Sequence, residues 1–134
     1  MHVLVRVGVV VVFASQVIFA QTLSRDTLDI YWIDVEGGSA TLIVTPNSES
    51  ILMDAGWPRS DDRDAQRIQA AMTDAGIDRL NYFITSHFHT DHVGGLPALA
   101  DRVVIDQFID HGDSVEDNPE LWNPYLAVVS GKKR

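Results

Sequence analysis

Histidines gather in one short stretch of this chain, and this stretch constrains the fold more than any other feature. Three of the five histidines lie within residues 87–92, in the sequence HFHTDH, together with one aspartate. Residues 81–85 (NYFIT) come just before it and predict a strand, whereas residues 93–101 predict a short helix. The fold must therefore deliver these side chains from the end of a strand into a loop that leads to a helix.

The spacing within this stretch suits metal ions. Side chains two positions apart in an extended loop point the same way, so His87 and His89 can share one ion. Asp91 and His92 lie where the chain turns into the helix and can meet a second ion. Imidazole and carboxylate donors suit zinc first, with iron or manganese as alternatives. A solvated histidine-rich turn that binds metal only incidentally is the other explanation, and so restrictive a pattern disfavours it.

The absence of cysteine limits the chemistry of the chain. It excludes disulfides, cysteine-based zinc sites and a cysteine nucleophile, so metal ligands must be His, Asp or Glu. The formal net charge is -9, which disfavours extended binding to nucleic acid. The same charge is compatible with a small-molecule substrate.

The rest of the pattern predicts one α/β domain. Three short strands joined by tight turns predict an antiparallel meander, with Gly37, Gly38 and Ser39 as a simple hairpin turn. Apolar positions at helical spacing predict a helix over residues 61–75, capped by Ser60 and ended by Gly76. Residues 121–129 begin a further helix. The expected strands are residues 28–34, 40–45, 51–54, 81–85 and 103–110.

Residues 1–20 predict a signal peptide. An apolar run over residues 7–20 follows Arg6 and ends in Ile18-Phe19-Ala20, which fits a signal-peptidase site. The run is short for a membrane span, which needs about 20 apolar residues. Cleavage would leave residues 21–134 as the domain, without a stable membrane span, in the periplasm or outside the cell. A buried valine-rich strand and an uncleaved anchor are the alternatives.

Residues 28–112 resemble the metallo-β-lactamase superfamily. The resemblance rests on ILMDAG (residues 51–56) and on SHFHTDHVGG (residues 86–95), where Ser86 replaces the usual Thr of THxHxDHxGG. DVEGGSATLIV (residues 34–44) and FIDHG (residues 108–112) are most similar to the branch related to the hydrolase domain of competence proteins. The implied fold is the N-terminal half of an αββα sandwich, an α/β (α+β) arrangement with a mostly antiparallel sheet and helices on one face.

The resemblance also implies a function for these residues. In the superfamily, the residues matching His87 and His89 bind a first zinc ion, and those matching Asp91 and His92 bind a second. Asp91 would also be catalytic, by orienting a metal-bound hydroxide that attacks an ester, amide or phosphoester. Asp54 would support the loop or its histidines by hydrogen bonding.

One departure from the superfamily pattern matters. Members supply a further His, a bridging Asp and a final His from their C-terminal half, and residues 21–134 offer no match for them. We therefore expect a truncated domain with an uncovered sheet face, which favours pairing with the missing half or self-association. His111 is open as a substitute ligand, a substrate contact or a surface residue. Two other functions remain open, a competence-related phosphodiesterase and a non-catalytic metal-binding remnant or interaction module.

Overall fold

The computed structural model describes residues 25–115 and 118–134, so the expected signal peptide lies outside the described residues. Within them, five strands form one sheet and four helices accompany it. The strands are β1 (Asp29–Trp32), β2 (Thr41–Val44), β3 (Ser50–Met53), β4 (Arg79–Ile84) and β5 (Val104–Ile109). The helices are α1 (Arg63–Asp74), α2 (Thr90–Val93), α3 (Leu96–Ala100) and α4 (Pro119–Val129).

The sheet is mixed, and its strands lie side by side in chain order. β1, β2 and β3 pair antiparallel, which confirms the predicted meander. β4 pairs parallel with β3, and β5 pairs parallel with β4. These parallel pairs arise because α1 connects β3 to β4, while α2 and α3 connect β4 to β5, and such crossovers return the chain in the same direction. β3, β4 and β5 therefore all end at the same edge of the sheet.

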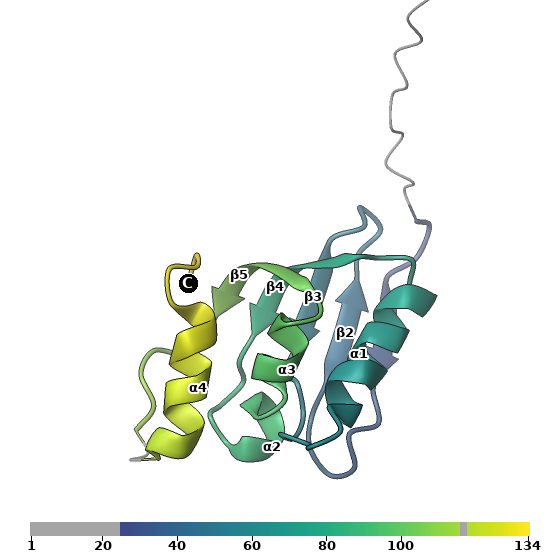
Figure 1. Cartoon of the computed structure of the whole chain (residues 1–134). Helices are drawn as coiled ribbons and strands as arrows, with labels where there is room; N and C mark the ends of the chain where they lie inside the picture. The colour runs from purple at the N-terminus through teal and green to yellow at the C-terminus, as the bar shows by residue number, and fades with distance from the viewer. Residues whose placement is uncertain (1–24, 116–117) are drawn as a thin grey trace, which may run out of the picture.

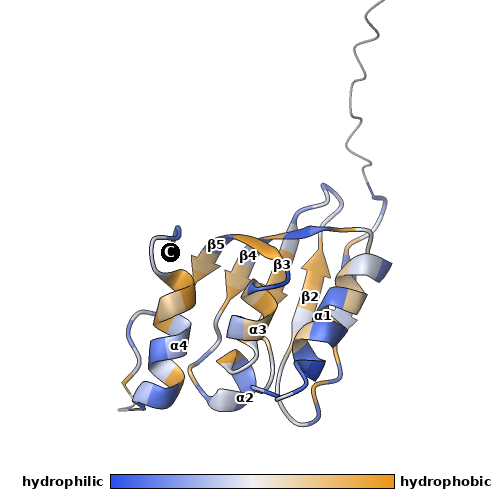
Figure 2. Ribbon diagram, viewed as in Figure 1, coloured by the Kyte–Doolittle hydropathy of each residue, from blue (hydrophilic) through white to orange (hydrophobic). Residues whose placement is uncertain are grey.

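The helices lie on one face of the sheet, as Figure 1 shows. Between the two layers, apolar side chains of the strands meet the buried stripe of α1, formed by Ala65, Ile68 and Met72. Leu42 and Leu52 are fully buried at the centre of the sheet, and Figure 2 shows how apolar the strands are. The expected α/β fold with helices on one face is confirmed.

The opposite face of the sheet carries apolar side chains that remain exposed. One row crosses all five strands, because Trp32 pairs with Thr41, Thr41 with Met53, Met53 with Ile84, and Ile84 with Ile109. Trp32 is 79% exposed, Ile109 is 40% exposed and Met53 is 36% exposed. In the part of the chain that the structure describes, no helix is long and apolar enough to cross a membrane.

The first helix begins later than the sequence predicts. α1 starts at Arg63 and not at Asp61, and its N-cap residue is Asp62, so the prediction that Ser60 caps it is wrong. The reason lies in Asp64, which is fully buried and accepts a 2.9 Å hydrogen bond from the backbone N–H of Trp57. That bond holds residues 57–62 as a loop against the helix start. Gly76 ends the helix with φ +66°, as predicted.

The helix predicted over residues 93–101 is divided. α2 ends at Val93 and α3 starts at Leu96. The backbone N–H of Gly95 donates to the carbonyl of Gly56 at 3.0 Å, so it is lost to any continuous helix. Pro97 also lacks an N–H, and such residues are tolerated only in the first turn of a helix. The two short helices therefore meet at an angle set by Gly94 and Gly95.

Substitutions at two neighbouring residues of β3, which point to opposite faces, test which face of the sheet is covered. Leu52→Ala should lower the free energy of unfolding by about 2–5 kcal/mol, because Leu52 is fully buried beneath the helices. Met53→Ala should lower it by less than about 1 kcal/mol, because Met53 faces the open side. Urea unfolding of both variants measures the difference. Equal losses would mean that the second face is also covered.

Candidate metal centre

The residues of interest meet at the edge where the three parallel strands end. Asp54 follows β3, Ser86 follows β4 after Thr85, and Asp110 and His111 follow β5. Ligands in open α/β sheets bind outside this edge, because the loops that leave the carboxyl ends of the strands lie next to one another there. The motif over residues 86–92 occupies the central loop of the three.

Asp54 is the centre of the hydrogen bonding at this edge. Its side chain is buried and its backbone has φ +62°, a left-handed conformation that Asp tolerates better than most residues. The carboxylate accepts the Ser86 backbone N–H at 2.9 Å, the Ser86 hydroxyl at 2.7 Å and Nδ1 of His92 at 2.8 Å. A carboxylate only accepts, so this bond places a proton on Nδ1, and in the neutral imidazole the lone pair is then on Nε2 of His92.

The four motif side chains lie together beyond Asp54. The His87 ring centroid is 3.8 Å from that of His92 and 4.6 Å from that of His89. Nε2 of His92 lies 3.5 Å from a carboxylate oxygen of Asp91. The lone pair that Asp54 leaves on His92 therefore faces the carboxylate expected to share a metal ion with it.

The side chains of the motif are of the types that bind zinc, but their ligand atoms are not arranged around a common point. Three imidazoles and one carboxylate are the groups that zinc prefers in a protein without cysteine. Across residues 25–115 and 118–134, however, no three His, Asp or Glu side chains are arranged to hold one ion. His87 and His92 touch through their rings, so their rings must rotate before their nitrogens can meet at a common point.

Backbone hydrogen bonds fix the position of this loop. Ser39 N–H donates to the carbonyl of Asp91 at 3.1 Å, and Ala55 N–H donates to the carbonyl of His92 at 2.6 Å. A Cβ added at Gly38 would overlap the carbonyl oxygen of Asp91. The turn at residues 37–39 is therefore more than the simple hairpin turn that the sequence predicts, because it holds the metal loop from one side.

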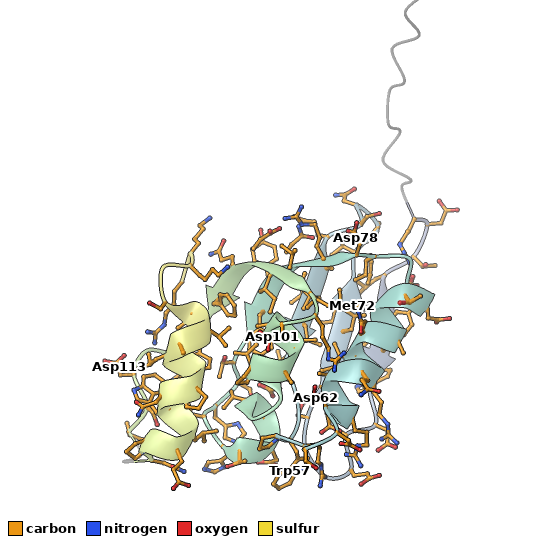
Figure 3. The ribbon with its side chains drawn as sticks, in the orientation of Figure 1. Trp57, Asp62, Met72, Asp78, Asp101 and Asp113 are labelled. Carbon is orange, nitrogen blue, oxygen red and sulfur yellow. The ribbon has the colours of Figure 1, made fainter. Side chains whose placement is uncertain are left out.

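Trp57 belongs to the same junction and sequence reasoning missed it. Figure 3 shows Trp57 at the bottom edge of the molecule, below Asp62 at the start of α1. A Cβ at Gly38 would lie 3.1 Å from Trp57 Nε1, so the indole packs against the hairpin that holds the loop. In the described residues, Nε1 is buried without a hydrogen-bond partner. Trp57 reaches the hairpin through the packing of segments that are distant in the sequence, and no local pattern in the sequence indicates this contact.

His111 contacts Phe88, a residue of the metal loop that is not a candidate ligand. It is exposed, and its ring centroid is 5.0 Å from that of Phe88, which points into the core on the other side of the loop from His87 and His89. None of the contacts described for His111 involves His87, Asp91 or His92. This arrangement favours the surface role among the three left open for His111.

Asp110 takes part in a separate network. It accepts the hydroxyl of Tyr125 at 2.6 Å and Nε of Arg134 at 2.6 Å. Burial acts to raise the pKa of Asp110, but the hydrogen bonds from Arg134 and Tyr125 outweigh it and hold the pKa below its ordinary value. Burial, and then the Asp110 carboxylate, raise the pKa of Tyr125, so the phenol stays a donor. Asp110 is thereby occupied in joining β5 to α4.

Asp54→Asn tests whether Asp54 determines which ring nitrogen of His92 carries the proton. The amide can donate where the carboxylate only accepts, so the proton of neutral His92 should move from Nδ1 to Nε2. Nitrogen-15 NMR of the imidazole ring measures this directly in the metal-free chain. Asp101→Asn is the matched control, since Asp101 is exposed on the far end of α3. A His92 ring that keeps its proton on Nδ1 in Asp54→Asn would contradict the assigned role of Asp54.

Several solved structures that are similar to this chain are metallo-β-lactamases. A metallo-β-lactamase variant from Cronobacter sakazakii is 28% identical over 59% of this chain and 30% of its own, with a TM-score of 0.46. MEM-A1, a subclass B3 enzyme from a soil metagenome library, is 33% identical over 55% of this chain and 27% of its own, with a TM-score of 0.43. BJP-1, a subclass B3 enzyme of Bradyrhizobium japonicum, is 20% identical over 66% of this chain and 34% of its own, with a TM-score of 0.46.

These matches cover about a third of each solved structure at most, whereas the family model covers most of this chain. No curated protein matches the chain. The family model described as the metallo-beta-lactamase superfamily matches residues 33–132, which include β2 to β5, both crossovers and the motif. The chain therefore belongs to the metallo-beta-lactamase superfamily.

Proposed function

We propose that this chain supplies the first metal ligands of a zinc-dependent hydrolase. The observation that carries the proposal is the hydrogen bond from His92 Nδ1 to buried Asp54, which leaves Nε2 free beside Asp91. Ligating histidines commonly donate their other ring N–H to a carboxylate in this way. A surface histidine cluster has no need of such a buried acceptor.

The motif residues divide between two ions in this proposal. His87 and His89 would bind one zinc ion, while Asp91 and His92 would bind the other. Bound zinc lowers the pKa of a coordinated water to about 7 and polarises the bond to be cleaved. Asp91 would also orient the attacking nucleophile, and Asp54 with Ser86 would hold the loop in place. An ester, an amide or a phosphoester is the substrate class, with the phosphodiester of a competence-related enzyme included.

The charge of the chain restricts the substrate. A formal net charge of -9 opposes an extended nucleic-acid strand, whose phosphates need a basic surface. A small molecule interacts mainly with the charges at the edge of the sheet, where bound zinc would offset the negative charge of Asp91. We therefore propose a small-molecule substrate.

A non-catalytic function is the second candidate. It is favoured by the lack of any preassembled three-ligand group in the described residues and by the exposed apolar face around Trp32. In this case the chain would bind metal weakly and associate through that face, with a second copy or with another part of a superfamily domain.

Metal titration tests the ligands that both functions require. His87→Ala and Asp91→Ala should each lower the zinc bound, whereas His111→Ala should change it little because His111 lies against Phe88. The motif offers about two protein ligands to each ion, where a catalytic zinc normally has three. We therefore expect the chain alone to bind one zinc ion or fewer, with hydrolysis near background. Calorimetry with parallel ester and phosphodiester assays measures both quantities.

Three results would change this proposal. An equal loss of zinc in His111→Ala would make His111 a ligand. Two tightly bound zinc ions with robust turnover would mean that the described residues complete the site themselves. Zinc binding without turnover, even when other superfamily segments are supplied, would favour the non-catalytic function.

Export is part of the proposal, because the sequence of residues 1–20 has the order of a signal peptide. The exported form should begin at Gln21, directly after Ile18-Phe19-Ala20. N-terminal sequencing of the material outside the cytoplasm measures the cleavage point. Intact Met1 in that fraction would contradict the cleavage.

A further inference from the structure

A pocket of about 600 Å³ opens on the helix side of the molecule, away from the motif histidines. It lies between the loop before α1, the α2–α3 segment and α4. Its volume falls within the usual range of about 300–1,000 Å³ for small-molecule sites. Residues on its wall include Arg59, Asp62, Thr90, Leu121, Pro124 and Tyr125. We call it the Arg59 pocket, and the proposed hydrolysis makes no use of it.

Among residues 25–115 and 118–134, the guanidinium of Arg59 has no counter-ion, and its Nε is buried without a hydrogen-bond partner. Its side chain lies over the ring of Trp57, with Cζ 5.4 Å from the ring centroid. In the described residues every other arginine forms an ion pair with a carboxylate. These paired arginines are Arg25, Arg63, Arg67, Arg79, Arg102 and Arg134. Arg59 lines the pocket, so an anion that enters it meets a positive charge that no described carboxylate offsets.

The other charges on the wall leave Arg59 available to an anion. Asp62 is already bound by Arg102 at 2.8 Å, so its charge is largely offset. Glu120 is exposed at the first turn of α4 and is the remaining carboxylate on the described lining. It repels anions, which favours a single negative charge over the two charges of a phosphate monoester.

Much of the wall is apolar. Pro97 of α3 and Leu121 and Pro124 of α4 contribute to it, with the ring of Tyr125 behind them. An apolar body can bury its surface there while an acidic group reaches Arg59. A guanidinium pairs well with a carboxylate, because its parallel N–H groups match the two oxygens.

We propose that the Arg59 pocket binds a small amphipathic carboxylate, with its acidic group on Arg59 and its apolar part against α3 and α4. Thr90, which directly precedes Asp91, lines the pocket, so the ligand lies behind the metal loop and not among its histidines. Binding should therefore need no metal. This separates the proposal from the function of the metal centre.

Titration of the full chain with 4-phenylbutyrate in the presence of EDTA tests the proposal. Calorimetry or amide NMR shifts should report binding at one site, with shifts centred on residues 90–98 and 118–125. The neutral amide, 4-phenylbutyramide, should bind about tenfold more weakly, since it loses a charge-assisted hydrogen bond. Arg59→Gln should weaken the acid by the same factor. Arg67→Gln is the matched control, because Arg67 pairs with Asp34 away from the pocket, and it should leave binding unchanged.

Two further variants guard against a trivial loss of fold. Glu120→Gln removes the opposing charge at an exposed position and should tighten binding of the acid about twofold or more, a gain that unfolding cannot produce. His87→Ala should bind the acid as the parent chain does. Equal affinity for acid and amide, an equal loss in Arg67→Gln, unchanged or weaker binding in Glu120→Gln, or a loss in His87→Ala would each overturn the proposal. No binding of the acid at all would overturn it as well.

Discussion

The buried carboxylate of Asp54 is the interaction on which the metal loop depends. It joins three parts of the fold, namely the end of β3, the end of β4 through Ser86, and α2 through His92. An acceptor buried this deeply has no water to replace its donors, and losing one hydrogen bond to it costs about 1–3 kcal/mol. The loop is therefore held by charge and hydrogen bonding at a point where apolar packing alone would leave its direction undefined.

The parallel pairing of β3, β4 and β5 brings the remaining parts to that carboxylate. Because the three strands end together, the residues that follow them become neighbours although they are far apart in the sequence. The loop then has two sides. The motif histidines lie on one side, and the Arg59 pocket touches the other side at Thr90. One short helix, α2, thus separates two environments of different chemistry.

The sequence predicts the local parts of this structure well. Short runs of aromatic and β-branched residues between turns predict all five strands to within a few positions, and the helical repeat predicts α1. The fold class and the superfamily are confirmed, whereas the metal ligands stay a prediction. Ser60 was expected as a cap because propensity cannot anticipate that buried Asp64 binds the Trp57 backbone. Contacts between distant segments, such as Ser39 with Asp91, leave no local signal, and neither does an arginine without a partner.

The hydrogen bonds from Ser39 and Ala55 to the metal loop also affect the order in which parts of the chain fold. The β1–β3 meander forms from neighbouring segments, so its loop-closure entropy is small. The parallel pairs require whole helices to be placed first, and contacts of such long sequence separation form slowly. The metal loop follows the parallel strand β4 and accepts hydrogen bonds from Ser39 and Ala55, which flank the strands of the meander. The metal loop should therefore be the last part of the domain to assemble and the first to open, and its side chains meet only in a chain that has finished folding.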